Sequence, residues 1–228
     1  MNFLIFFLIL GGFLLLPLKA LAFGPGVHLE LSLKLLEKGF FLEGATGLAF
    51  LYGSIVPDFF VSSSTLKALF HREEAFERLL KGASSPFQMA FALGYRAHLE
   101  ADRFAHQDLI PAFGRRLDLP VRAIHYYLEW TLERNRLPYW YFLRGLLLWP
   151  GHRKLDRFLL DSFELEPRKF LTRKWVSLTS YYLFKIRRRL PPTNLALLFE
   201  RRFQSIYPKC LDQMRASILS SGVKGCES

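Results

Sequence analysis

The residues best suited to chemistry in this sequence are histidines and carboxylates that recur at four-residue spacing. His98, Asp102 and His106 lie four residues apart in one segment, and His125 and Glu129 repeat the spacing further along. An α-helix turns by about 100° per residue, so residues four apart are offset by only about 40° and share one stripe of its surface. Imidazole nitrogen and carboxylate oxygen are the ligands that zinc takes when no thiolate is offered. The pattern therefore predicts a metal site between two neighbouring helices.

A simpler interpretation is that these are polar residues on a solvated helix face, or core histidines that pair with a carboxylate. The flanking residues argue against it, because Ala97, Leu99, Ala101, Ile124 and Leu128 indicate helices that are buried on most sides. Burying several polar or charged groups without a neutralising partner is costly. A bound cation removes that cost, so the metal hypothesis is favoured.

Two further candidate ligands lie upstream. Asp58 directly follows Pro57 at the end of an apolar segment, and His71 comes 13 residues later. Taken alone, Asp58 is typical of a helix cap and His71 of a surface residue. Their value as ligands depends on the pattern of the whole chain. His152, by contrast, stands apart from the pattern and is expected at the surface.

The segments that carry these residues have helical periodicity. From His28 onward the apolar residues recur at helical spacing, and no run of alternating residues indicates a strand. Ser85 and Pro86 are suited to cap and open the helix that contains His98. We therefore predict an all-α fold, a compact multi-helix single domain with a buried metal cluster. Besides the helix that begins near His28, the predicted helices cover residues 66–80, 87–107, 118–133, 156–163, 172–189 and 194–214.

Composition narrows the class of protein. The 228 residues carry a formal net charge of +11 and 51% are hydrophobic, which excludes a disordered chain and a bundle of membrane spans. The only two cysteines are Cys210 and Cys226, which excludes a disulfide-dense scaffold and a zinc site of four thiolates. These two cysteines could close one loop in an oxidising compartment.

The N-terminus has the features of a signal peptide. An uncharged, mostly apolar run from Phe3 to Leu16 is followed by Pro17 and then by an A-x-A cleavage motif at residues 20–22. We predict a signal peptide over residues 1–22, a mature domain over residues 23–228, and export to the periplasm or out of the cell. The alternative is an uncleaved N-terminal segment that anchors the protein in a membrane.

In its motifs and their order, the chain resembles the zinc-dependent phospholipase C and S1/P1 nuclease superfamily, all-helical secreted phosphodiesterases with three clustered zinc ions. The resemblance extends from Phe23 to about Glu129. Any one motif is a weak signal, whereas eight side-chain ligands in the family's order are a strong one. The motifs are Phe23-Gly-Pro-Gly-Val-His28, Pro57-Asp58, His71, His98-x-x-x-Asp102, His106 and His125-x-x-x-Glu129.

The resemblance implies three zinc ions, two of which share one ligand. The mature N-terminal residue, Phe23, would chelate one ion through its amine and carbonyl, together with His28 and Asp102. Asp102 would also bridge to a second ion. The remaining ligands would be Asp58, His71 and His98 for the second ion, and His106, His125 and Glu129 for the third.

The implied activity is hydrolysis of a phosphodiester. Zinc lowers the pKa of a bound water to about 7 and neutralises the phosphoryl oxygens as charge builds up during displacement. Asp58 is the candidate to orient or deprotonate the attacking water, although it could serve only as a ligand. Phe23 stands where characterised members usually have tryptophan. Glu129, rather than aspartate, as the last ligand favours the phospholipase branch.

Charge alone does not decide the substrate class. A basic protein attracts anionic lipid headgroups and polynucleotides alike. The segments Arg168–Trp175 and Tyr181–Arg189 interleave cations with aromatic side chains, as a membrane-surface or single-strand-binding face does, although an ordinary helix with a solvated basic face has the same pattern. We expect phospholipid as the substrate, with possible association with a membrane surface, and nucleic acid as the alternative. The competing class is a non-catalytic, metal-binding, membrane-associated protein.

Overall fold

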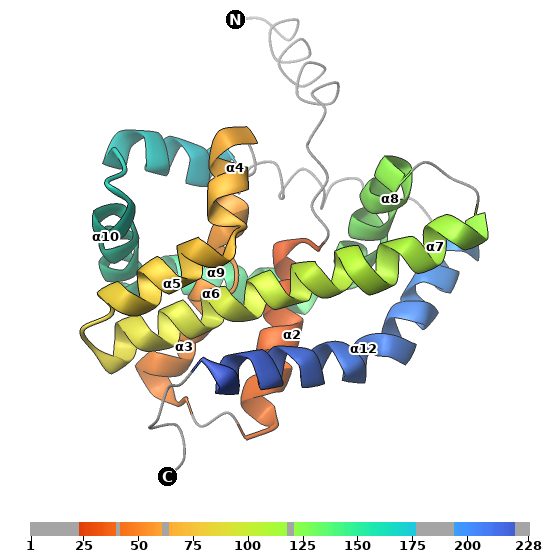
Figure 1. Ribbon diagram of the computed structural model, residues 1–228, viewed down its shortest axis with the longest axis horizontal. Coiled ribbons are helices and arrows are strands. Elements are labelled where there is room, and N and C mark those ends of the chain that lie inside the picture. The colour runs from red at the N-terminus through yellow and green to blue at the C-terminus, as the bar shows by residue number, and fades with distance from the viewer. Residues whose placement is uncertain (1–22, 40–41, 61–63, 118–120, 177–193, 222–228) are drawn as a thin grey trace, which may run out of the picture.

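The computed structural model describes residues 23–39, 42–60, 64–117, 121–176 and 194–221, and every regular element in these ranges is a helix (Figure 1). The all-α prediction is therefore confirmed. The predicted signal peptide, the segment from Tyr181 to Arg189 and Cys226 lie outside the described residues. Cys210 is buried beside Met214, with 3.8 Å between their sulfur atoms. Its pairing with Cys226 stays a prediction.

The described helices follow one another along the chain with short connections. The N-terminal half contains α2 (Pro25–Glu37), α3 (Gly44–Gly53), the 3-10 helix η1 (Val56–Phe60), α4 (Ser64–Phe70), α5 (Glu73–Gly82) and α6 (Pro86–Phe104). The C-terminal half contains the π-helix η2 (Ala105–Leu109), α7 (Ile110–Leu117), α8 (Val121–Arg134), α9 (Leu137–Leu148), α10 (Gly151–Phe163) and α12 (Asn194–Ser220). Residues 167–176 are also helical.

Helix α6 is the centre of the fold. As predicted, Ser85 caps it, since the Ser85 hydroxyl accepts a hydrogen bond from the Gln88 backbone N–H at 3.3 Å, and Pro86 occupies its first turn. The helix continues through η2 into α7 as one long rod, and α3, α5 and α12 pack along it (Figure 1). His98 and Asp102 therefore lie on the element around which the bundle is assembled.

Two glycines let α3 and α6 cross with their backbones in contact. A Cβ on Gly94 of α6 would overlap the carbonyl oxygen of Phe50, and a Cβ on Gly53 of α3 would overlap that of Phe91. Neither position has room for a side chain. Because His98 lies one turn beyond Gly94, the crossing brings its ring to the end of α3.

The segment around His71 differs from the predicted single helix over residues 66–80. The chain forms two helices there, α4 and α5, separated at His71 and Arg72. The His71 N–H donates to the Lys67 carbonyl at 3.0 Å, and Arg72 is extended, with φ −109° and ψ 156°. Periodicity missed the break because apolar residues recur at helical spacing on both sides of it. The turn directs His71 inward, so that its ring centre lies 5.3 Å from that of His98.

Helix α2 runs through the interior of the bundle. Eight of its thirteen residues are buried, His28 among them. It packs against α3, α6, α8, α9 and α12, so its sequence is apolar on most sides for reasons of packing. Within the described ranges, no helix is both long and apolar enough to span a bilayer.

Gly94→Ala is expected to destabilise the protein. The added methyl group would push α3 and α6 apart, and overpacking of this kind costs about 1–3 kcal/mol. Gly145→Ala on α9 is the matched control, because a Cβ there meets no atom within 4 Å. Replacing a mid-helix glycine at such a site should raise stability by about 0.5–1 kcal/mol. Urea unfolding followed by circular dichroism measures both changes, and a Gly94→Ala protein as stable as wild type would refute the role of the crossing.

Candidate metal centre

Five of the predicted ligands converge in the interior of the bundle. His28 comes from α2, Asp58 from η1, His71 from the break between α4 and α5, and His98 and Asp102 from α6. In two groups of three, the ligand atoms all lie within 4.8 Å of one another: His28, His98 and Asp102 form one group, and Asp58, His71 and His98 form the other. Since the groups share His98, the five residues form one set, which we call the ligand cluster.

The nitrogen-to-oxygen distances in the ligand cluster suit a shared cation better than direct hydrogen bonds. Nε2 of His28 lies 3.4 Å from Oδ1 of Asp102. Oδ2 of Asp102 lies 3.6 Å from Nε2 of His98 and 3.7 Å from Nε2 of His71. Hydrogen bonds between nitrogen and oxygen are typically about 2.7–3.2 Å long. Two ligands of one tetrahedral zinc ion, each about 2.0–2.1 Å from the metal, are about 3.3 Å apart.

Seven polar atoms of the ligand cluster are buried and have no hydrogen-bond partner in the described part of the chain. These atoms are both ring nitrogens of His28, both carboxylate oxygens of Asp58, Nε2 of His71 and of His98, and Oδ1 of Asp102. Each buried polar group left unpaired costs about 1–3 kcal/mol. Cations satisfy imidazole lone pairs and carboxylate oxygens together, so the residues present fit zinc.

Backbone carbonyls orient two of the imidazoles. Nδ1 of His98 lies 2.9 Å from the Ser54 carbonyl oxygen, and Nδ1 of His71 lies 3.0 Å from that of Lys67. A carbonyl only accepts, so each Nδ1 carries the proton, and the Nε2 lone pair is left to face the cluster. Burial lowers the pKa of His71 to about 4 and also lowers the pKa of His98. Both rings are therefore neutral at pH 7 and able to bind a metal.

The two carboxylates of the cluster have opposite electrostatic environments. Burial raises the pKa of Asp58 well above its usual range, and the charges of Asp102, Glu129 and Glu133 add to the effect. Burial acts in the same direction on Asp102, but His98 and His28 outweigh it and hold the pKa of Asp102 well below its usual range. Asp102 is thus the ionised centre of the cluster, and Asp58 is the carboxylate that most needs a cation beside it.

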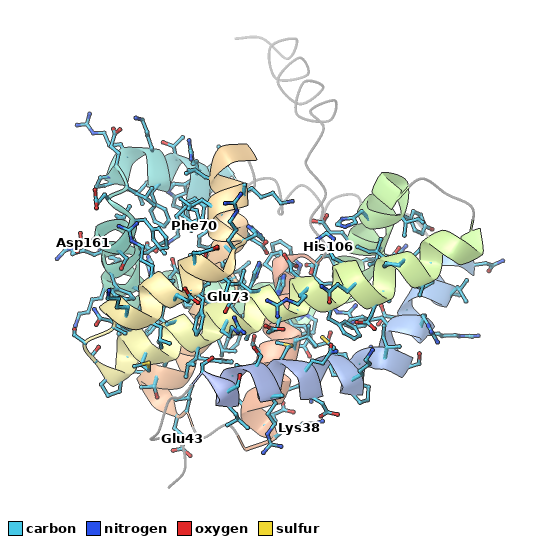
Figure 2. The ribbon with its side chains drawn as sticks, in the orientation of Figure 1. Lys38, Glu43, Phe70, Glu73, His106 and Asp161 are labelled. Atoms are coloured by element: carbon cyan, nitrogen blue, oxygen red, sulfur yellow. The ribbon has the colours of Figure 1, made fainter. Side chains whose placement is uncertain are left out.

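His106 does not continue the helical stripe of His98 and Asp102, contrary to the prediction from spacing. It lies in the π-helix η2, which holds more residues per turn than an α-helix and so breaks the four-residue register after Phe104. The exposed His106 lies by α8 (Figure 2), where its Nδ1 is 3.2 Å from Nε2 of His125. Of the three residues in the predicted stripe, His98 and Asp102 therefore belong to the ligand cluster, whereas His106 lies against α8.

Glu129 lies one turn beyond His125 on α8. Its side chain is buried, and its charge is close enough to raise the pKa of Asp58. The structure thus pairs His106 with His125 and brings Glu129 near the ligand cluster. A third zinc ion held by these three residues stays a prediction.

Phe23 lies beside the ligand cluster. Its side chain is fully buried, and its ring meets that of His28 edge-on at 6.0 Å and that of Phe203 on α12 at 5.5 Å between ring centres. The His28 ring stacks in turn on His98, with 3.9 Å between ring centres. Chelation of a metal by the Phe23 amine and carbonyl stays a prediction.

Glu133 supports the site and was not singled out by the sequence analysis. Its carboxylate accepts hydrogen bonds from the backbone N–H groups of Val27 at 2.8 Å and Gly26 at 3.1 Å, and from Nε1 of Trp140 at 3.1 Å. The unpaired N–H groups and the positive dipole end make the first turn of a helix a place for an anion. A Cβ on Gly24 or Gly26 would overlap this carboxylate, which explains the Gly-Pro-Gly sequence at the start of α2.

Arg136 extends this support to a third helix. Its Nε donates to Glu30 of α2 at 2.6 Å, and its Nη1 and Nη2 donate to Glu200 of α12 at 3.0 and 3.1 Å. Burial raises the pKa of Glu133 to about 7, although its N–H donors and Arg136 act in the opposite direction. Together Glu133 and Arg136 hold α2, and with it His28, against α8. A signal was present in the sequence, because Glu133 follows Glu129 at the same four-residue spacing.

Comparison with known proteins agrees with this geometry. Residues 27–184, well over half of the chain, match a family model described as zinc dependent phospholipase C. The matched span contains every predicted side-chain ligand, from His28 to Glu129, and Phe23 precedes it. No curated protein and no solved structure matches the chain.

Glu133→Gln is expected to loosen the start of α2. A side-chain amide cannot accept all three hydrogen bonds, and a buried donor left unpaired costs about 1–3 kcal/mol. Since His28 lies in the same turn, the zinc content of the purified protein should fall as well. Urea unfolding and elemental analysis measure the two effects.

The matched control is Glu37→Gln at the other end of α2, where the exposed carboxylate pairs with Lys34. It should leave the unfolding midpoint and the zinc content unchanged. If Glu133→Gln behaved like this control, the anchoring role of Glu133 would be wrong.

Proposed function

Because the chain belongs to the zinc-dependent phospholipase C family, we propose that it hydrolyses the phosphodiester bond of a phospholipid, with the ligand cluster as its catalytic centre. The observation that carries the proposal is a set of five ligands from four segments of the chain whose unpaired atoms face one another inside the protein. Unpaired buried polar atoms are rare in folded proteins because they are destabilising. Their concentration here supports a function that uses them.

Asp102 is the proposed bridge between two zinc ions. Its Oδ1 is directed towards His28, and its Oδ2 towards His71 and His98. Each oxygen could therefore bind a different ion. When bound, zinc supplies a water of lowered pKa and positive charge for the phosphoryl oxygens.

Asp58 is the proposed catalytic base. Both of its oxygens are without a hydrogen-bond partner among the described residues, and Oδ1 lies 3.8 Å from Nε2 of His98. One oxygen can therefore act as a ligand while the other orients the attacking water and accepts its proton.

The remaining ligands complete the proposal. His106, His125 and Glu129 would hold the third zinc ion. Cleavage after Ala22 during export would expose the α-amine of Phe23, which would then join His28 and Asp102 as a ligand. Export, to the periplasm or out of the cell, is part of this proposal because an amide nitrogen in an uncleaved chain is a poor ligand.

Phospholipid is preferred to nucleic acid because of the surface near α10. The helical residues 167–176 expose Trp175 at 67% and Leu171 at 47%, next to the exposed cations Arg168 and Lys169. Exposed apolar side chains beside cations suit the surface of a membrane. The net charge of +11 alone would also suit a polynucleotide, which is therefore the alternative substrate to test.

Asp102→Asn should be the most damaging single change at the site. Loss of one charged, shared ligand should lower both zinc content and phosphodiester hydrolysis, the latter by more than about 100-fold, since changes outside the metal ligands already cost about 10- to 100-fold. Asp212→Asn, an exposed aspartate on α12, is the matched control and should change neither. Elemental analysis and a chromogenic phosphodiester assay provide the readouts. Full zinc content in the Asp102 variant would exclude it as a bridge.

The substrate preference is tested by direct comparison. At one physiological ionic strength, release of phosphorylated headgroup from phospholipid vesicles should exceed cleavage of single-stranded DNA or RNA. Salt is matched because basic proteins gain nonspecific affinity for nucleic acid steeply as salt falls. The reverse ranking would assign the chain to nucleic acid hydrolysis, and bound zinc without turnover on any substrate would indicate a non-catalytic protein.

A further inference from the structure

A cavity of about 760 Å³ lies between α9, α10 and the helical residues 167–176, and the proposed chemistry does not use it. Its walls are mainly apolar and include Leu147, Leu148, Leu160, Leu165, Phe170 and Leu171. We call it the α10 cavity. Its volume is in the range of about 300–1,000 Å³ that is usual for ligand pockets. Asp161, on its lining, and His106 lie on opposite sides of the molecule in Figure 2.

Exposed apolar side chains surround the opening of the α10 cavity. Leu148 is 72% exposed, Trp175 67% and Leu171 47%, and all three line the cavity. Single exposed apolar residues need no explanation, but a group around a hollow indicates a binding surface. Arg153 and Arg157 also line it, are exposed, and form no ion pair with any residue in the described ranges. The opening is therefore both apolar and cationic.

The polar side chains at the floor of the α10 cavity pair with one another. Nζ of Lys174 lies 2.7 Å from Oδ2 of Asp156 and 2.7 Å from the hydroxyl of Tyr52, and that hydroxyl donates to Oδ1 of Asp156. His152, expected at the surface, is half-buried here, with Nδ1 2.6 Å from the Trp149 carbonyl oxygen. Because these groups satisfy one another, the floor does not require a charged ligand. An uncharged hydrocarbon chain can lie against it.

A second cavity, of about 350 Å³, shares part of its lining with the α10 cavity. The shared residues are Leu165 and Phe170, and the rest of its lining is Phe60 and Leu66 with the charged side chains Glu166, Lys169 and Arg173. Phe60 lies two residues after Asp58 on η1. Leu66 lies on α4, the helix that ends directly before His71. The smaller cavity is therefore lined in part by η1, which carries Asp58, and by α4, which His71 follows.

From these observations we propose that the α10 cavity and its smaller neighbour bind the acyl chains of the phospholipid substrate. The inference rests on the proposed function, since it assigns the apolar part of the same molecule whose phosphodiester is cleaved. The leucines and Phe170 replace water around the chains. Arg153 and Arg157 lie at the opening, where they would face the phosphates of an anionic lipid surface.

The test compares two soluble lipids that differ only in chain length, dibutanoyl and dioctanoyl phosphatidylglycerol, both used as monomers with the zinc-loaded protein. The wild type should show a KM at least about tenfold lower for the dioctanoyl lipid, because each buried methylene group favours binding. Leu160→Trp fills the α10 cavity and should abolish this difference, while kcat/KM for the dibutanoyl lipid is unchanged. Leu197→Trp on α12, at a position 46% exposed and outside the cavity lining, is the matched control.

Equal effects of Leu160→Trp on both lipids, or no effect on either, would overturn the assignment, provided that the unfolding midpoint shows a folded variant. A second measurement needs no turnover. Phosphatidylglycerol with brominated chains, again as a monomer, should quench tryptophan fluorescence, and Trp175→Phe should remove most of the quenching. Quenching without hydrolysis of any phospholipid would keep the cavity assignment and reject the proposed function. Hydrolysis without quenching would do the reverse.

Discussion

Five polar side chains share the interior of this bundle, and the energetic cost of keeping them there governs how the rest of the molecule is built. His28, Asp58 and His98 are almost fully buried, with unpaired atoms that face one another. The five side chains cannot hold one another in place, because the carboxylates of Asp58 and Asp102 repel each other and the nitrogen-to-oxygen distances are too long for hydrogen bonds. Each ligand must therefore be fixed from outside the cluster. The carbonyls of Ser54 and Lys67, which receive the Nδ1 protons of two imidazoles, are the simplest form of such support.

Larger supports act on whole helices. The crossing at Gly53 and Gly94 brings two backbones into contact, so α6 cannot rotate and carry His98 away without first separating from α3. At the other side, the Glu133 carboxylate occupies the positive end of α2 and leaves no room for side chains at the start of that helix. Both supports use backbone groups, which have fewer alternative positions than side chains. Preorganisation of the cluster therefore depends on residues that touch no metal.

Much of this arrangement could be predicted from the chain, and the misses have physical causes. Helical periodicity predicted the fold class, and four-residue spacing predicted that His98 and Asp102 share a face. Spacing could not predict the π-turn that redirects His106, because local sequence does not distinguish it from a regular helix. The break at His71 was missed because apolar residues recur at helical spacing on both sides of it. Glu133 continues the four-residue spacing of His125 and Glu129. Its role could not be predicted from that spacing, because two of its partners are backbone N–H groups more than 100 residues away.

The distribution of the ligands over α2, η1, the α4–α5 break and α6 ties the abundance of the folded protein to its surroundings. An ion that binds only when these segments are together favours the native state by mass action, by about 2.7 kcal/mol when the free metal is at a hundred times its dissociation constant. Without bound metal, the protein would unfold locally more often and be degraded sooner by proteases that attack transiently unfolded segments. The amount of folded protein that survives in a compartment would then follow the zinc supply there, without any dedicated sensor.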